Sequence, residues 1–76
     1  MKKVERVVLV FASVHYAMKA EKYLKSAQWP FWLIPLPPAI NDGCGLGIQI
    51  VPADQHEVEI FLKQFEIVPV KSVTMK

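Results

Sequence analysis

The chain has 76 residues, of which 53% are hydrophobic, and its formal charge at pH 7 is only +2. This length predicts a single domain over residues 1–76, with enough apolar residues for a core without disulfides or metal. The basic residues are too few and too dispersed for a nucleic-acid-binding face, and no apolar run is long enough to span a membrane. One unpaired cysteine and no visible signal peptide predict a cytoplasmic protein.

The first half of the chain predicts a strand, a helix and a second strand. Residues 7–11 are continuously apolar and largely β-branched, which is typical of a central strand buried on both faces. Ser13 is a candidate N-cap for a helix over 14–27, whose small apolar residues fall on one stripe. Pro30 ends this helix, and residues 31–34 resume strand character. Prolines follow this strand and favour an edge position.

The second half predicts a strand, a helix and a last strand. A glycine-bearing loop over 39–45 leads into an alternating strand over 46–51. Asp54 and Glu57 form a capping-box pattern at the start of a second helix. Four apolar residues at helical spacing predict the core-facing stripe of this helix: Val58, Phe61, Leu62 and Phe65. Residues 68–73 complete the pattern as a short strand, whose proline favours the other edge.

This element order predicts an α+β fold. The β-α-β-β-α-β sequence is typical of a ferredoxin-like sandwich, with a four-stranded antiparallel sheet in the order 4-1-3-2 and two helices on one face. The third strand would run antiparallel to the first, so its start should lie beside the end of the first strand. The loop before it would then meet the N-terminus of the first helix, near Ser13, Val14 and His15.

Cys44 is the only cysteine, and it lies between Gly43 and Gly45. A lone thiol cannot form an internal disulfide or a multi-cysteine metal site. Flanking glycines leave the sulfur uncrowded and let backbone N–H groups turn toward it. The predicted position near a helix N-terminus favours a thiolate or a persulfide. The sequence therefore predicts a reactive thiol, with an inert cysteine packed under the sheet end as the alternative.

Ser13 and His15 are the other candidate residues around this thiol. Helix capping explains Ser13 fully. His15 is a candidate proton relay or cationic neighbour of the sulfur, and a solvated histidine in the first helical turn is the alternative. One cysteine and two histidines on different elements do not match zinc-ligand spacing, and no phosphate-binding glycine loop is present. We expect no metal and no cofactor.

Several short stretches of the chain resemble the selenium/sulfur carrier protein-like family, a family without an established activity. The matching stretches are residues 11–13, 17–24, 33–37, 44–48 and 52–54. The resemblance implies a small cytosolic bacterial or archaeal protein, in which the pair Cys44-Gly45 underlies a carrier role. Two positions depart from the family's pattern: Gly43 replaces a small polar residue before the cysteine, and Gln49 stands where a basic residue is common.

Together these features predict a carrier rather than a stand-alone enzyme. Cys44 would transiently hold a persulfide or perselenide between a cysteine desulfurase-type donor and a sulfur or selenium acceptor protein. We expect neither nucleic acid nor a membrane as a partner. The alternatives are a regulatory or protein-interaction module that uses the surface over Trp29–Pro38, and a purely structural partner subunit.

Trp29, Phe31 and Trp32 form an aromatic cluster ahead of the prolines. We expect one ring to pack against a helix and another to line an edge strand. Exposed aromatic residues and an available strand edge are suited to docking. The edge next to Trp32 is therefore a candidate contact for a second copy, giving a homodimer, or for another protein.

Overall fold

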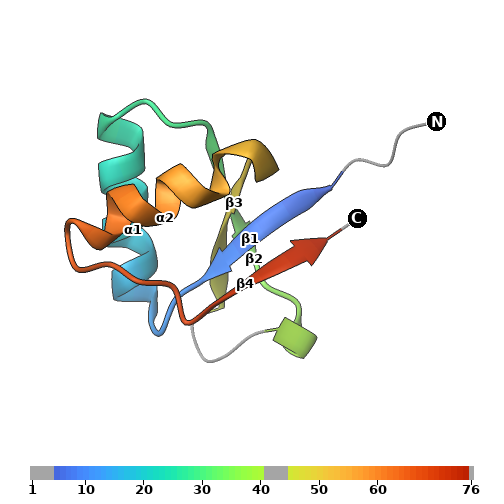
Figure 1. Ribbon diagram of the computed structural model, residues 1–76. Helices are drawn as coiled ribbons and strands as arrows, with labels where there is room; N and C mark the ends of the chain where they lie inside the picture. Colours follow the sequence, from blue (N-terminus) through green and yellow to red (C-terminus); the bar gives the residue numbers. More distant parts are fainter. Residues whose placement is uncertain (1–4, 41–44, 76) are drawn as a thin grey trace.

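The computed structural model describes residues 5–40 and 45–75. Its elements, in chain order, are β1 (Arg6–Val10), α1 (Val14–Ser26), β2 (Phe31–Pro35), η1 (Pro38–Ile40), β3 (Leu46–Ile50), η2 (Pro52–Asp54), α2 (Gln55–Lys63) and β4 (Lys71–Met75) (Figure 1). The predicted α+β order of strands and helices is confirmed. The structure adds two short 3-10 turns, η1 and η2.

The four strands form one antiparallel sheet in the order β2-β3-β1-β4. This is the predicted order 4-1-3-2 read from the opposite edge, and the two proline-flanked strands, β2 and β4, occupy the edges as expected. The start of β3 lies beside the end of β1, because Val10 pairs with Gly47. On the other side of β1, Val10 pairs with Lys71.

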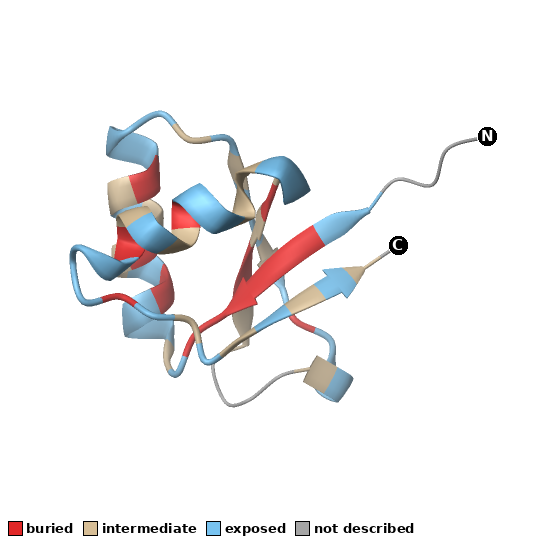
Figure 2. Cartoon of the chain, viewed as in Figure 1, coloured by how far each residue is buried: buried red, intermediate tan, exposed pale blue. Residues whose placement is uncertain are grey.

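Both helices cover one face of the sheet, as predicted (Figure 1). Their fully buried residues are Ala17, Ala20, Leu24, Val58 and Leu62. These side chains pack in one cluster with alternate residues of the central strands, such as Leu9 and Ile48. The small alanines let α1 approach β2 and β3 closely, and Figure 2 shows buried positions along both helices and on the central strands.

The opposite face of the sheet carries a second, smaller apolar cluster. Val8 and Val10 are fully buried there, beneath Leu36 and the partly buried Ile40. Both of these covering residues come from the connection between β2 and β3, which folds back over β1. This explains why β1 is continuously apolar: each of its faces is covered, as its sequence predicts.

The predicted capping box at the second helix is wrong. The Asp54 side chain makes no capping hydrogen bond, and its backbone has φ −92° and ψ −6°. An N-cap residue needs an extended backbone so that its side chain can reach back to the first free N–H groups. Asp54 is already helical because η2 leads straight into α2.

The end of α2 and the start of β4 also differ from the prediction. The helix ends at Lys63, so Phe65 lies beyond it and is 37% exposed. Its ring instead stacks on Tyr23 of α1, with centroids 4.0 Å apart. The last strand begins at Lys71 rather than at residue 68. Just before it, the backbone N–H of Val70 donates a hydrogen bond to the carbonyl of Val10.

Both helices end with the same hydrogen-bond pattern. Gln28 and Glu66 have φ values of 63° and 62°, in the left-handed region. The N–H of the following residue, Trp29 or Ile67, donates to the carbonyl of Leu24 or Leu62 at 2.9 and 3.1 Å, respectively. This is the Schellman arrangement, in which glycine is the favoured left-handed residue. Here that position is held by side chains that carry a steric cost.

We therefore predict that Gln28→Gly and Glu66→Gly each stabilise the protein, by about 0.5–1 kcal/mol, because glycine adopts positive φ without a Cβ clash. Urea unfolding of the two variants measures the change. The control is Ala27→Gly, one residue earlier in a right-handed conformation, which should not stabilise the fold. A loss of stability in both test variants would contradict this account.

Candidate functional site

The N-terminus of α1 is fixed by Ser13. Its backbone is extended, with φ −154° and ψ 164°, and its Oγ accepts a hydrogen bond from the N–H of Tyr16 at 3.4 Å. The predicted N-cap is therefore present. Serine suits this position because its short hydroxyl satisfies one of the free N–H groups of the first turn.

His15 lies in the first turn of α1 and is exposed. Its ring meets the ring of Tyr16 edge-on, with centroids 5.8 Å apart and an interplanar angle of 68°. This is a surface contact between neighbours in the chain. It leaves the imidazole accessible to solvent and to a docking molecule.

Gly45 is the residue through which the chain enters β3. Its φ of 77° lies in the left-handed region, where glycine is favoured over residues with a Cβ. Its carbonyl accepts a hydrogen bond from the N–H of Leu36 at 3.0 Å. The backbone at Gly45 is thus tied to the connection that covers the far face of the sheet.

Gly47 serves a different purpose from Gly45. A Cβ at this position would lie 2.6 Å from Cδ2 of Leu36 and 2.7 Å from Cγ1 of Val8. Neither distance is compatible with a methyl group unless these side chains move. The glycines at 45 and 47 are therefore explained by backbone conformation and by close packing, not by a phosphate-binding loop.

The strand register brings Ser13 and Gly45 to the same end of the sheet. Val10 pairs with Gly47, Ser13 follows Val10 by three residues, and Gly45 precedes Gly47 by two. The other two predicted site residues, Gly43 and Cys44, lie outside the described residues. The described part of the site is thus a capped helix N-terminus with an accessible histidine, at the end of the sheet where Gly45 enters β3.

The predicted aromatic cluster is divided between two places. Trp29 and Phe31 pack against the core on the helix side, and the Trp29 ring lies 6.4 Å from that of Phe61 on α2. Trp32 lies on edge strand β2 and is 51% exposed. One ring packs on a helix and one lines an edge strand, as the sequence predicts.

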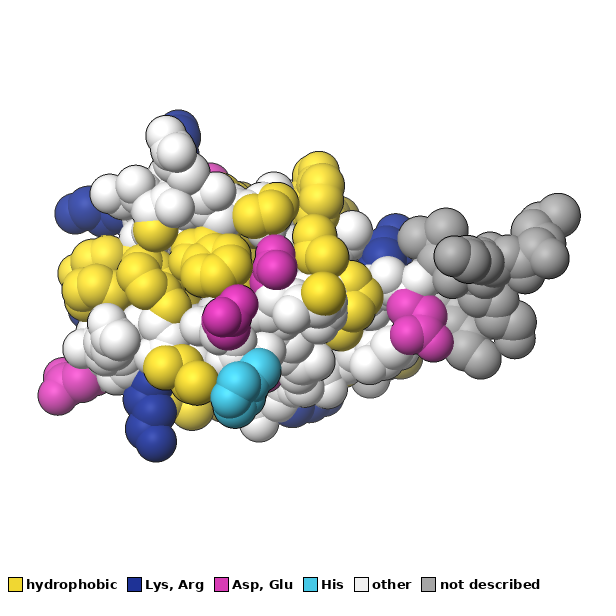
Figure 3. Space-filling view, turned by 45° about the horizontal axis from the view of Figure 1, so that its top comes forward, with side chains coloured by type: hydrophobic (Ala, Val, Ile, Leu, Met, Phe, Trp, Pro, Cys, Tyr) yellow, Lys and Arg dark blue, Asp and Glu magenta, His cyan; other side chains and the backbone are white. Residues whose placement is uncertain are grey.

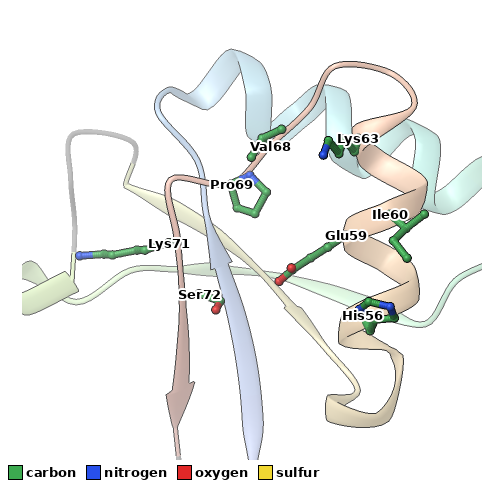
Figure 4. A pocket seen from close by; sticks show the side chains of 8 residues that line it. All are labelled: His56, Glu59, Ile60, Lys63, Val68, Pro69, Lys71 and Ser72. Atoms are coloured by element: carbon green, nitrogen blue, oxygen red, sulfur yellow. The ribbon is translucent and has the colours of Figure 1, made fainter.

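A groove of about 420 Å³ opens between α2 and the start of β4 (Figure 4). The side chains that line it include His56, Glu59, Ile60, Lys63, Val68 and Ser72. Beside it, Gln55 Nε2 donates to Glu59 Oε2 at 3.0 Å and to Ser72 Oγ at 3.2 Å. Figure 4 shows Glu59 extending from α2 toward the strands.

This groove was not predicted from the sequence, although the residues of β4 indicate it. Ser72 points toward the helix layer, as its bond to Gln55 shows, and Thr74 shares that face by strand alternation. The corresponding positions of β3 are Ile48 and Ile50, which are buried in the core. Small polar residues beneath α2 therefore leave a partly open space where the other half of the sheet has packed apolar side chains.

In residues 5–40 and 45–75, no three His, Cys, Asp or Glu side chains come together in a group that could hold a metal ion. Neither α1 nor α2 is long and apolar enough to cross a membrane, a finding limited to the same residues.

Comparison with known families gives one match. A family model described as Putative Se/S carrier protein-like matches residues 6–73, which takes in β1 to β3, both helices, the Cys44-Gly45 pair and the first part of β4. The chain belongs to this family. The resemblance seen in the short sequence stretches is thereby confirmed. No curated protein matches the chain.

We predict that Gly47→Ala destabilises the protein by about 1–3 kcal/mol, because the added methyl group overpacks the contact between Leu36 and Val8. Denaturant unfolding measures the loss. The matched control is the same substitution in a Leu36→Ala background, where the nearest obstructing atom is gone and the cost should shrink. An equal cost in both backgrounds would show that Leu36 does not set the requirement for glycine.

Proposed function

We propose that this protein is a sulfur or selenium carrier whose Cys44 transiently holds a persulfide or perselenide. The observation that carries the proposal is the match to the selenium/sulfur carrier family over residues 6–73, in a chain with a single cysteine. A carrier needs one accessible thiolate and a docking surface, and no second catalytic residue. Cys44 is the proposed source of this thiolate.

The proposed loading step is a thiol exchange that needs no oxidant. The Cys44 thiolate attacks the outer sulfur or selenium atom of a donor persulfide or perselenide. The donor's S–S or S–Se bond breaks, the donor leaves as a thiolate, and the outer atom becomes bonded to Cys44. Unloading is the same exchange with an acceptor thiolate. A cysteine desulfurase-type protein is the proposed donor, and a sulfur- or selenium-using protein is the acceptor.

The surroundings described above support this proposal. Ser13 and Gly45 share one end of the sheet, and Gly45 is covalently joined to Cys44. A helix N-terminus carries partial positive charge, which stabilises a nearby thiolate. We infer a ferredoxin-like sandwich as the scaffold, because β-α-β-β-α-β order and two helices on one face are its features. Accessible His15 is a proposed cationic neighbour or proton relay.

The proposal predicts that Cys44 can be loaded with sulfur. After incubation with a cysteine desulfurase and cysteine, intact-mass spectrometry should show a gain of one sulfur atom on the wild-type chain and none on Cys44→Ala. The added sulfur should leave on exposure to an acceptor thiol, because the exchange is reversible. A thiol that stays unmodified and resists alkylation would contradict the carrier proposal.

Two substitutions of Ser13 test whether the N-terminus of α1 stabilises the Cys44 thiolate. Aspartate and asparagine cap helices about as well as serine, so Ser13→Asp and Ser13→Asn should both keep the fold. Only aspartate adds a negative charge, which disfavours a thiolate nearby. Alkylation of Cys44 by iodoacetamide near neutral pH should be roughly two- to fivefold slower in Ser13→Asp than in Ser13→Asn. Equal rates would place the sulfur beyond the reach of this helix end.

A protein-interaction module that uses the surface over Trp29–Pro38 is the second candidate function. The observation in its favour is the exposure of Trp32 on β2, at 51%; Leu33, on the other face of the strand, is 38% exposed. In that case Cys44→Ser leaves partner binding intact while Trp32→Ala weakens it. The two functions are compatible, because a carrier must also recognise its partners.

A further inference from the structure

α1 presents an apolar flank to solvent on the side that faces away from α2. The buried residues of this helix, which face the sheet, are Ala17, Ala20 and Leu24. Tyr23 stacks on Phe65, just after the end of α2, so that side of α1 faces α2. At 3.6 residues per turn, Val14 and Met18 lie on the opposite flank. Their side chains are 41% and 53% exposed.

This flank lies beside the strands that lead to the proposed carrier residue. α1 contacts β3 and β2, and it begins at the end of the sheet where β2 ends and β3 starts. Leu33 of β2 pairs with Ile48 of the core, so its side chain is on the helix face, where it is 38% exposed. Exposed Pro35 pairs with Leu46, the residue after Gly45. The exposed apolar side chains of α1 and β2 thus lead to the glycine that is joined to the proposed carrier cysteine.

The exposed apolar residues of this region, here called the α1–β2 surface, are Val14, Met18, Leu33 and Pro35. We infer that this is the docking surface of the protein that loads Cys44. The inference rests on the proposed function, because a donor protein must reach the cysteine to transfer an atom to it. Methionine suits such a surface, because its flexible side chain adapts to the shape of a partner. The first turn of α1 also has no acidic residue, although acidic side chains stabilise a helix N-terminus.

The charges of α1 indicate the chemistry of the donor's contact. Lys22 and Lys25 are exposed, whereas Glu21 is the only acidic residue of this helix and is partly buried. Lys22 borders the α1–β2 surface, because residues four apart, such as Met18 and Lys22, are neighbours on a helix. An apolar contact bordered by lysines fits a protein surface whose apolar side chains are bordered by carboxylates. The inferred occupant is such a surface on a cysteine desulfurase-type donor.

The groove between α2 and β4 is a poorer match for this donor. Ile60 and Val68 are 50% and 63% exposed there, but the groove also holds Glu59 and Lys63, one charge of each sign. Figure 3 shows acidic side chains next to hydrophobic ones on the face of the molecule that it presents. Carboxylates repel an acidic partner. In addition, β1 separates β4 from the strand that follows Gly45.

Loading rates with two different donors test the inference. The chain receives sulfur either from a cysteine desulfurase with cysteine, or from glutathione persulfide, which transfers its outer sulfur to Cys44 and leaves as the glutathione thiolate. Intact-mass spectrometry measures both rates. Met18→Gln should load about threefold or more slowly from the desulfurase and at the wild-type rate from glutathione persulfide, because only the protein donor needs the α1–β2 surface. The matched control is Ile60→Gln, which removes a similarly exposed apolar side chain from α2 and should change neither rate.

A charge reversal tests the acidic border of the donor. Lys22→Glu should slow loading from the desulfurase about fivefold or more at low ionic strength, and less at high ionic strength, because salt screens exposed charges. Lys63→Glu reverses a charge at the end of α2, outside the α1–β2 surface, and should leave the rate unchanged. Thermal unfolding of each variant checks that the fold is retained.

The two donors separate failure of the docking surface from failure of the carrier function. Equal desulfurase rates for the wild type and Met18→Gln overturn the docking surface and leave the carrier function intact, as does loading from glutathione persulfide alone. A loss in Met18→Gln with both donors overturns the docking surface too, because the substitution would then act on the reactivity of Cys44. Absence of loading from either donor overturns the carrier function and the docking surface together.

Discussion

The contact between Leu36 and Gly47 is the constraint on which the two-sided structure of the sheet depends. It allows the connection between β2 and β3 to fold back over Val8 and Val10, so that the central strand is shielded on both faces. A small domain has little interior to spare, and this cover gives it a second apolar cluster without another helix. The same connection holds Gly45 by a backbone hydrogen bond. Core packing and the entry to the proposed carrier residue thus depend on one local arrangement.

Hydrogen bonds within the described residues fix the backbone on either side of the proposed site. Ser13 anchors the start of α1, and the antiparallel register sets the start of β3 against the end of β1. A carrier benefits from a fixed backbone, since its reactive atom must be offered to two different proteins in turn. Chemical selectivity can then reside in those partners, while the small domain supplies a thiol in a defined position.

Most of the fold could be predicted because its signals are local and strong. The buried strand β1, the serine cap and the proline-flanked edges each follow from a few adjacent residues. The wrong prediction at α2 reflects competition between adjacent residues. Asp54 has the sequence pattern of a helix cap, but it belongs to the 3-10 turn η2, so its backbone is helical and not extended. The groove beside β4 was missed because it depends on how far α2 reaches across the sheet, which spacing alone does not reveal. At this end of the sheet, the sequence predicted the helix cap at Ser13, whereas the reason for glycine at position 47 needed the position of Leu36.

The separation of the two tryptophans has a practical consequence for experiments in solution. Trp29 lies against Phe61 in the helix layer, while Trp32 is half exposed on an edge strand. The indole of Trp29 should therefore emit at shorter wavelength and resist a soluble quencher better than that of Trp32, because water reaches it less. The protein thus carries two tryptophan fluorophores, one in the helix layer and one on the β2 edge, and selective excitation of tryptophan reports on these two places without a label.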